Sequence, residues 1–260
     1  MGSFASETAD QYSRYRRGYP DVVVDAVVQR LGLGSDDAVL DMGCGTGLLT
    51  RPLARRTRIA IGVDPEADML AIARQCTDAD LRSRVVWLLG SDAELLSVQS
   101  LLGPHTLGAI TIGQALHFMD YTTLFRDAKV LLRTGGGVAV ISNGVPLWQQ
   151  DSDWSRALRD ALEGWFRVKA TATCGTDIVT QRRYAEALAT AGYEVSEIFY
   201  DYEAELTFEQ ILGGVYSSLS PDSIPIDRRD GFAEHLRRAL APTVTLAEAV
   251  PVRALVGLVG

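Results

Sequence analysis

Three glycines separated by single residues follow a short apolar run near the start of the chain. Gly43, Gly45 and Gly47 come directly after residues 38–42, and the residues that follow have a helical pattern. Glycine lets the backbone approach a ligand closely and adopt positive φ without steric cost. The helix that begins there adds unpaired N–H groups and a partial positive charge. This segment predicts a nucleotide-like ligand site, and the alternative is a plain turn between a strand and a helix.

Two acidic residues beside this loop narrow the choice of ligand. Asp64 ends the next apolar run, 21 residues beyond Gly43. That spacing is expected of a carboxylate that accepts hydrogen bonds from ribose hydroxyls. Asp41 begins the loop and suits a ligand with an ammonium group better than a pyrophosphate. Position 48 is Leu48, where the dinucleotide pattern has its third glycine.

The elements that must position these residues alternate along the chain up to residue 143. Strand-like runs of a few apolar residues are separated by stretches with helical periodicity. The predicted strands are 38–42, 58–63, 85–89, 108–112 and 138–142, and the predicted helices are 21–31, 47–56, 66–76, 93–102 and 121–133. This alternation indicates a parallel sheet with helices on both faces. Ligands then bind in the loops that follow the strands.

The pattern changes after residue 143. Trp148, Trp154 and Trp165, three of the four tryptophans, lie within 146–170. They either form a lid against a hydrophobic ligand or fill the core of a packed helix. Later segments alternate again, with helices expected at 181–191, 207–219 and 231–240 and strands at 193–200 and 250–259. We expect one domain over 1–260, made of a helical cap (1–35), a cofactor-binding core (36–143), a variable lid (144–192) and closing strands with substrate-side helices (193–260).

Several segments together resemble the class I S-adenosylmethionine (SAM)-dependent methyltransferases. The Asp-x-Gly-x-Gly-x-Gly run at 41–47 looks like the first family signature, and 63–69 looks like the second. Residues 90–94 resemble the stretch after the third strand, and 113–120 resemble the loop after the fourth. Residues 131–137 resemble the turn into the fifth. These segments occur in the family's order and spacing.

The resemblance implies both a fold and a cofactor. The fold is α/β, a Rossmann-like seven-stranded, mostly parallel sheet with helices on both faces, an N-terminal helical segment and a lid insertion after strand five. SAM is the implied cofactor and S-adenosylhomocysteine (SAH) its product. Asp64 would bind the ribose, Asp92 the adenine amine, and the Ala93 N–H would face the ring. The residues assigned to cofactor binding in the core are Asp41, Gly43, Cys44, Gly45, Thr46, Gly47, Asp64, Pro65, Met69, Asp92, Ala93 and Gln114.

The N-terminal residues are similar to the opening of a small-molecule subgroup, the trans-aconitate-methyltransferase-like or methyltransferase type 11 group. The similarity covers residues 12–20, and residues 206–220 resemble the same group's late helix. It implies that the N-terminal segment folds over SAM and that Tyr12 and Arg16 reach the methionine carboxylate. The alternative is an aromatic, basic surface helix docked on the core.

His117 is the candidate general base. It lies in the loop after the fourth predicted strand, and histidine titrates near neutral pH. Methyl transfer from a sulfonium is an in-line displacement, so orientation and the protonation state of the acceptor are what the protein must supply. The alternative is a histidine that only binds substrate or shapes the pocket. His105 and His235 are expected at the surface.

The predicted function is methyl transfer from SAM to an oxygen, nitrogen or carbon atom of a small molecule, in bacterial secondary metabolism. Two alternatives stay open. One is a protein that binds SAM without transferring a methyl group, and the other is an NAD(P)-dependent oxidoreductase. No metal site is predicted, because the three histidines and three cysteines lack the spacing of zinc ligands.

Charge and composition restrict the partners. The net charge is −8 over 260 residues. A nucleic-acid partner is therefore not expected, because phosphate contacts need a basic surface. No apolar run is long enough to span a membrane, and no signal peptide is recognised. The expected location is cytoplasmic, and the oligomeric state, monomer or homodimer, stays open.

Overall fold

A seven-stranded sheet runs through one lobe of the molecule in the order β3-β2-β1-β4-β5-β7-β6. In this computed structural model, residues 7–241 and 245–260 are described. The strands are β1 (Ala38–Met42), β2 (Ile59–Asp64), β3 (Val85–Leu89), β4 (Leu107–Gly113), β5 (Leu132–Asn143), β6 (Tyr193–Glu205) and β7 (Ala247–Val259). Strands β1 to β5 pair with one another in parallel, and β7 is antiparallel to both β5 and β6. The predicted fold is confirmed, and the strand order reverses between β1 and β4.

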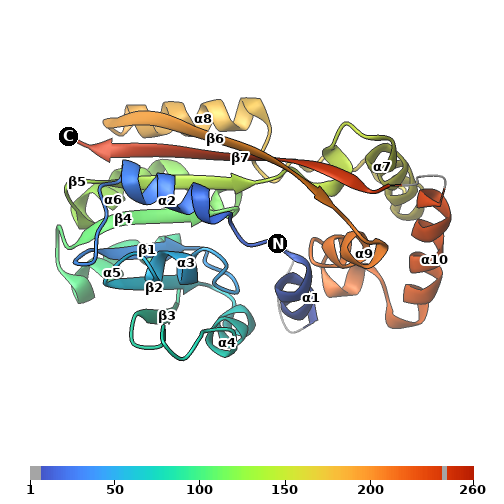
Figure 1. Cartoon of the computed structure of the whole chain (residues 1–260), viewed down its shortest axis with the longest axis horizontal. Helices are drawn as coiled ribbons and strands as arrows, with labels where there is room; N and C mark the ends of the chain where they lie inside the picture. The colour runs from blue at the N-terminus through green and yellow to red at the C-terminus, as the bar shows by residue number, and fades with distance from the viewer. Residues whose placement is uncertain (1–6, 242–244) are drawn as a thin grey trace.

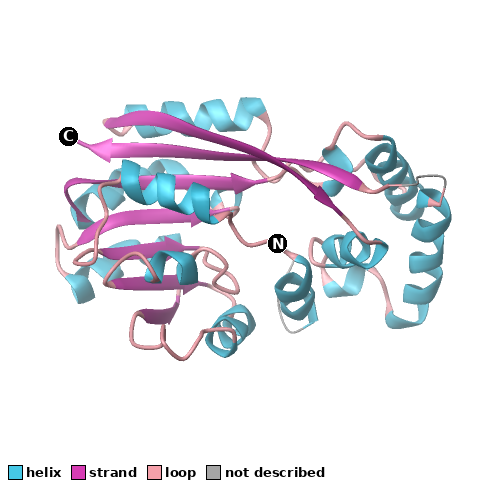
Figure 2. Ribbon diagram, viewed as in Figure 1, coloured by secondary structure: helices cyan, strands magenta, loops and turns pink. Residues whose placement is uncertain are grey.

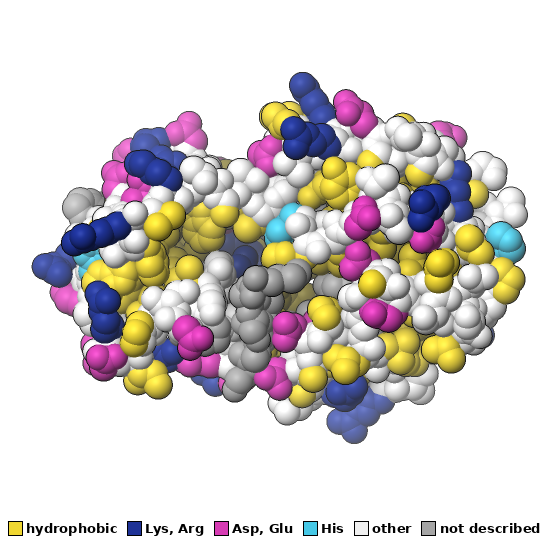
Figure 3. Space-filling model, turned by 180° about the vertical axis from the view of Figure 1, so that it is seen from behind, with side chains coloured by type: hydrophobic (Ala, Val, Ile, Leu, Met, Phe, Trp, Pro, Cys, Tyr) yellow, Lys and Arg dark blue, Asp and Glu magenta, His cyan; other side chains and the backbone are white. Residues whose placement is uncertain are grey.

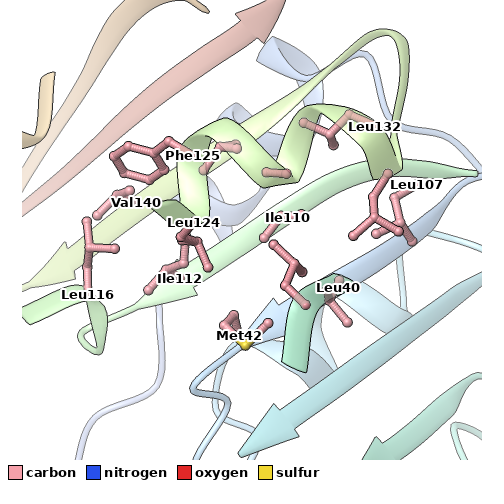
Figure 4. Close-up of a cluster of buried hydrophobic side chains, with 14 of the residues drawn as sticks. Leu40, Met42, Leu107, Ile110, Ile112, Leu116, Leu124, Phe125, Leu132 and Val140 are labelled. Atoms are coloured by element: carbon pink, nitrogen blue, oxygen red, sulfur yellow. The ribbon is translucent and has the colours of Figure 1, made fainter. Parts of the chain in front are cut away.

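Helices cover both faces of this sheet (Figures 1 and 2). They are α2 (Asp21–Arg30), α3 (Thr50–Ala54), α4 (Ala67–Gln75), α5 (Leu95–Leu102), α6 (Tyr121–Leu131) and α8 (Ile178–Thr190). Successive side chains of a strand point to opposite faces. In β1, Leu40 and Met42 therefore pack under α5 and α6, while Val39 packs under α2 and α3. Figure 4 shows Leu124 and Phe125 of α6 facing the first of these two cores.

A second lobe consists of helices (Figure 1). It contains α7 (Asp153–Phe166), α9 (Phe208–Tyr216) and α10 (Arg229–Leu240), with α1 (Glu7–Tyr15) packed against α9. Its core includes Trp154, Leu158, Ile211, Phe232 and Leu236. The long strands β6 and β7 extend from the sheet into this lobe. Short 3₁₀ turns occupy Asp92–Glu94, Leu116–Phe118, Leu147–Gln149, Pro221–Ser223 and Ile226–Arg228.

The tryptophans after β5 fill this helical core. Trp154 is buried and its indole N–H donates to the carbonyl of Ala247. The Trp165 ring meets Phe232 edge-on, at 5.2 Å between ring centroids. For these tryptophans, the structure therefore favours packing in a core over the alternative of a lid. Throughout residues 7–241 and 245–260, no helix combines the length and apolar character needed to cross a membrane.

Some element boundaries differ from the sequence expectation. The helix expected over 47–56 is shorter, because Gly47 has a φ of +79° and closes a turn onto Cys44. Strand β5 begins at Leu132 instead of residue 138. At Gly137 a Cβ would lie 2.3 Å from the carbonyl oxygen of Gly257, so only glycine permits this close approach of β5 and β7.

Candidate functional site

The glycine loop after β1 lies at the point where the strand order reverses. Gly43 has a φ of +68°. A Cβ at Gly43 would lie 2.5 Å from the Ala115 Cβ and 2.8 Å from the Met119 Cε. Only glycine therefore lets the loops after β1 and β4 touch here. This places the predicted cofactor loop beside the segment that carries His117.

Asp64 is the acid that the structure brings to this loop. Its carboxylate accepts the N–H of Gly45 at 2.8 Å and the N–H of Glu66 at 2.9 Å. Only 7% of the residue is exposed. Burial raises the pKa of Asp64, while the two N–H donors oppose that rise. The spacing in the sequence thus corresponds to a direct contact between the end of β2 and the glycine loop.

Asp41 has a different environment. Its two carboxylate oxygens accept the hydroxyls of Thr50, at 2.5 Å, and Thr111, at 2.9 Å. Burial raises the pKa of Asp41 to about 6, although both hydroxyls favour the charged form. Asp41 therefore joins β1 to β4 and α3. Only 1% of the residue is exposed, so its carboxylate faces these elements and not open solvent.

Two loop side chains complete this part of the site. Thr46 is buried, and its hydroxyl has no hydrogen-bond partner among the residues that the structure describes. Such a group is costly to leave unpaired, so it fits a polar ligand atom. Cys44 lies against Gly62, and burial raises the pKa of its thiol well above the usual value. Cys44 is therefore a neutral packing group.

The residues predicted to lie on the adenine side of the site are on the whole more exposed than those of the glycine loop. Met69 is buried on α4, whereas Pro65 is exposed. Asp92 accepts the N–H of Asp120 at 3.0 Å, which joins the loops after β3 and β4. The N–H of Ala93 donates to the Ser91 hydroxyl at 3.3 Å, so a ring facing it would share this donor.

His117 lines a small cavity at the ends of β4 and β5. Burial, followed by the nearby Arg16 cation, lowers the pKa of His117 to about 4, so the imidazole is neutral at pH 7. Within the described part of the chain, neither ring nitrogen makes a hydrogen bond, and the ring lies 3.9 Å from that of Phe118. Gln114 lines the same cavity with a φ of +57°, and its amide donates to the carbonyl of Asn143. Both side chains therefore have polar atoms available to a ligand.

The opposite wall of this cavity comes from the segment between α7 and α8. Cys174 and Gly175 have φ values of +51° and +75° and form a tight turn, in which Thr176 N–H donates to the Thr173 carbonyl. Gln181 holds the turn by donating to the carbonyl of Gly175 at 2.6 Å. The sequence analysis missed this wall, because neither motif nor spacing connects residue 174 with residue 117.

The N-terminal helix forms the remaining side. The Tyr12 ring lies 3.8 Å from where a Gly45 Cβ would be, so it covers the glycine loop. Arg16 lies over the Tyr12 ring, 5.3 Å from its centroid, and also donates to Ser217 and Ser218 beyond α9. From behind, a hollow separates the two lobes (Figure 3). The structure thus brings Tyr12, Arg16 and His117 to one region.

A larger cavity of about 240 Å³ lies between α1, α9 and α10. Its lining includes Glu7, Gln11, Tyr216 and Arg229 but neither the glycine loop nor His117. Because the larger cavity contains none of the residues predicted to bind the cofactor, we place the candidate site at the glycine loop. Over residues 7–241 and 245–260, no cluster of three or more His, Cys, Asp or Glu side chains is arranged to hold a metal ion.

Sequence comparison identifies a known domain in this region. Residues 39–136 match the family model described as a methyltransferase domain. An uncharacterized methyltransferase of Mycobacterium tuberculosis is 30% identical over 156 residues, which are 60% of this chain and 53% of that protein. A trans-aconitate 2-methyltransferase of Pseudomonas paraeruginosa is 30% identical over 155 residues, 58% of this chain and 50% of that protein. The chain spans about half the length of the curated relatives it matches.

Solved structures share the fold across nearly the whole chain. A protein of Anaeromyxobacter dehalogenans assigned to the type II methyltransferases has a TM-score of 0.62 at 19% identity, covering 94% of this chain and 98% of that one. A precorrin 8W decarboxylase of Methanobacterium thermoautotrophicum has a TM-score of 0.57 at 15% identity, covering 96% and 98%. These likenesses concern the fold alone. Residues 39–136 thus match a methyltransferase domain, and nearly the whole chain shares its fold with these solved structures.

Proposed function

We propose that this protein transfers a methyl group from SAM to a small-molecule acceptor. The observation that carries the proposal is the buried Asp64 carboxylate, bonded to the N–H of Gly45 where the strand order reverses. A carboxylate at the end of the second strand, beside a glycine loop, suits the hydroxyls of a ribose. The unpaired hydroxyl of Thr46 gives the loop a further polar group for the same ligand.

The remaining cofactor contacts follow from the placement of the loops. Asp92 and Ala93, beyond β3, would meet the adenine. Gln114 and Tyr12 would meet the methionine end, because Tyr12 covers Gly45 and Gln114 lines the adjoining cavity. Arg16 is the further candidate for the methionine carboxylate. The bound cofactor supplies an activated methyl group, and the protein supplies orientation and exclusion of water.

His117 is the proposed base for the acceptor. Its imidazole is neutral at pH 7, because burial and Arg16 lower its pKa to about 4. A neutral nitrogen that has no partner among the described residues is in the form that accepts a proton or a hydrogen bond from an acceptor O–H or N–H group. The alternative role is positioning of that group without proton transfer.

The acceptor is proposed to be a small molecule. The acidic chain, with a net charge of −8, does not favour nucleic acid, and one relative is named for trans-aconitate, itself a small molecule. A cytoplasmic role in bacterial secondary metabolism, within a single domain over 1–260, stays part of the proposal. Monomer and homodimer both remain open.

Binding without methyl transfer is the competing function, because a fold does not determine an activity. Titration calorimetry with SAM, SAH and NADPH, each added to the purified chain, tests the cofactor. Micromolar binding of SAM and SAH without NADPH binding is expected. Binding of NADPH alone would contradict the proposal. Formation of SAH with a panel of small acceptors then separates transfer from binding.

A further inference from the structure

Tyr184 of α8 is a buried tyrosine that lines the same small cavity as His117. Only 3% of the residue is exposed, and the ring of Tyr121 meets its ring edge-on, at 5.0 Å between ring centroids. Among the described residues, the Tyr184 hydroxyl has no hydrogen-bond partner. A buried hydroxyl is costly to leave unpaired, so this one is suited to a polar atom of a ligand in the cavity.

Gly175 brings this hydroxyl close to the side chain of His117. Gly175 has a φ of +75° and lines the same cavity. A Cβ at this position would lie 2.8 Å from the hydroxyl oxygen of Tyr184 and 3.3 Å from the Cβ of His117. Because one point is this close to both side chains, both border the space that the missing Cβ leaves open.

The cavity admits one small, uncharged group. Its volume is about 10 Å³, which is the room that a single water molecule needs. Among the described residues that line it, none is Asp, Glu, Lys or Arg. Burial lowers the pKa of His117 to about 4 and raises the pKa of Cys174, so both side chains are neutral at pH 7. A carboxylate or an ammonium group in this cavity would therefore lack a counter-charge in its lining.

Tyr184 and His117 offer complementary hydrogen bonds to such a group. Burial, followed by the neighbouring Tyr121 and Asp177, raises the pKa of Tyr184 to about 12, so its hydroxyl keeps the proton and can donate. The neutral imidazole of His117 has one nitrogen that accepts. A ligand hydroxyl both accepts and donates a hydrogen bond, so it satisfies both side chains, whereas a methyl group satisfies neither.

We propose that Tyr184 is a specificity-determining residue, whose hydroxyl donates to the acceptor oxygen while His117 accepts the proton of that oxygen. The acceptor group is then an uncharged hydroxyl. The proposal rests on the proposed methyl transfer and names its acceptor atom. The oxygen forms a bond to the methyl carbon, the bond between that carbon and the sulfur breaks to leave SAH, and the hydroxyl proton passes to His117. Gln114, which we place at the methionine end of the cofactor, lines the same cavity.

The imidazole of His117 can report on a ligand in this cavity. The chain has only three histidines, so NMR spectra of protein labelled with nitrogen-15 in histidine are readily assigned, and His105 and His235 are internal references. The protein is saturated with SAH, which fills the cofactor site. Phenol is then titrated in as the hydroxyl probe. Toluene has a methyl group in place of the hydroxyl, and benzoate has a charged group there.

A saturable shift of the His117 signals with phenol is expected, with weaker responses to toluene and benzoate. Tyr184→Phe removes only the hydroxyl and should weaken the phenol response about five- to tenfold, the effect of one lost hydrogen bond. The toluene response and the SAH affinity should stay within about twofold. Urea unfolding should show no loss of stability, because the hydroxyl has no partner among the described residues.

Tyr121→Phe is the matched control for Tyr184→Phe. Tyr121 belongs to the same aromatic pair, but it is not part of the cavity lining. Removal of its hydroxyl should leave the phenol titration of the His117 signals like that of the unchanged protein. A phenol response weakened equally in both variants would show that the aromatic pair acts through packing, and it would overturn the proposal.

Four further results would contradict the proposal. Equal responses to phenol and toluene would show that the hydroxyl is not recognised, and a stronger response to benzoate would show that the cavity prefers a charge. An unchanged phenol response in Tyr184→Phe would leave Tyr184 as a core residue. No phenol response with SAH bound, together with a tenfold loss of SAH affinity in Tyr184→Phe, would assign Tyr184 to the cofactor. Failure of the unchanged protein to bind SAH would instead refute the proposed function, and phenol titration of the free protein would still test Tyr184.

Discussion

Asp64 is the residue whose substitution tests the cofactor assignment most directly. Asp64→Asn keeps the size of the side chain but removes its charge. SAH affinity should fall about 10- to 100-fold, because hydrogen bonds to a charged group contribute about 1.5–3 kcal/mol. Titration calorimetry measures the change.

Asp78→Asn is the control for Asp64→Asn. It removes an acid whose partner is the exposed Arg55, and exposed ion pairs contribute little. Its SAH affinity should match that of the unchanged protein. Since Asp64 also accepts the N–H of Gly45, the melting temperature of both variants is recorded. An Asp64→Asn protein that binds SAH normally would refute the ribose assignment.

The pKa of His117 predicts how kcat/KM depends on pH. The pKa of about 4 keeps the imidazole neutral across the physiological range. If His117 accepts the proton of the acceptor, kcat/KM should stay level as the pH falls from 7 to about 5 and decline only near pH 4. A decline centred near 6.5, the usual pKa of histidine, would contradict the buried environment.

His117→Gln separates the two roles of this residue. Loss of a general base lowers kcat about 10²- to 10⁴-fold. SAH affinity should change little, because His117 lines the small cavity at the ends of β4 and β5, and Asp64 is not part of that lining. A loss of SAH affinity as large as the loss of kcat would place His117 in the cofactor pocket instead.

At the scale of elements, the docking of α1 on α9 depends on Gly213. A Cβ at this position would lie 2.1 Å from Cδ2 of Tyr15. Gly213→Ala should therefore displace Tyr15 and with it the helix that carries Tyr12, together with Arg16 directly after the helix. We expect faster hydrogen exchange over residues 7–19 and weaker SAH binding, while exchange in the β1–β5 strands stays unchanged.

Gly164→Ala is the matched control within α7. Gly164 is exposed and a Cβ there meets nothing within 4 Å. Alanine should stabilise this helix by up to about 1 kcal/mol and leave exchange in α1 unchanged. Equal exchange of α1 in both variants would show that the contact of Tyr15 with Gly213 does not hold the helix.

The sheet and its helices could be predicted from the sequence because their signals are local. Apolar runs give the strands and helical periodicity gives the helices, and Asp64 and Gly45 are 19 residues apart. In the helical lobe, α9 and α10 were expected from local patterns, but the packing of the lobe has no such signal, because α7 and α10 meet through Trp165 and Phe232 from distant parts of the chain. The wall at Cys174 and the serine pair that anchors Arg16 are likewise created only by tertiary packing.

At the scale of the whole molecule, two ion pairs join the described residues 7–17 to distant parts of the chain. Arg17 pairs with Glu248 at the start of β7, and Glu7 pairs with Arg229 at the start of α10. Glu248 is only 3% exposed and also accepts the amide of Gln150 at 2.6 Å. Glu7 is half-exposed, so its pair contributes less. Of these two ion pairs, the one between Arg17 and Glu248 therefore contributes more to the attachment of the cap.

Arg17→Met leaves the Glu248 carboxylate buried without its cation. Removing one partner of a buried pair costs about 3–5 kcal/mol, and the partial exposure of Arg17 reduces this to about 2–3 kcal/mol. Urea unfolding measures the free energy of unfolding. Adding Glu248→Gln to Arg17→Met should recover most of the loss, because a neutral amide needs no cation. If the double variant is as unstable as Arg17→Met alone, packing of the Arg17 side chain, and not charge, attaches the N-terminal cap.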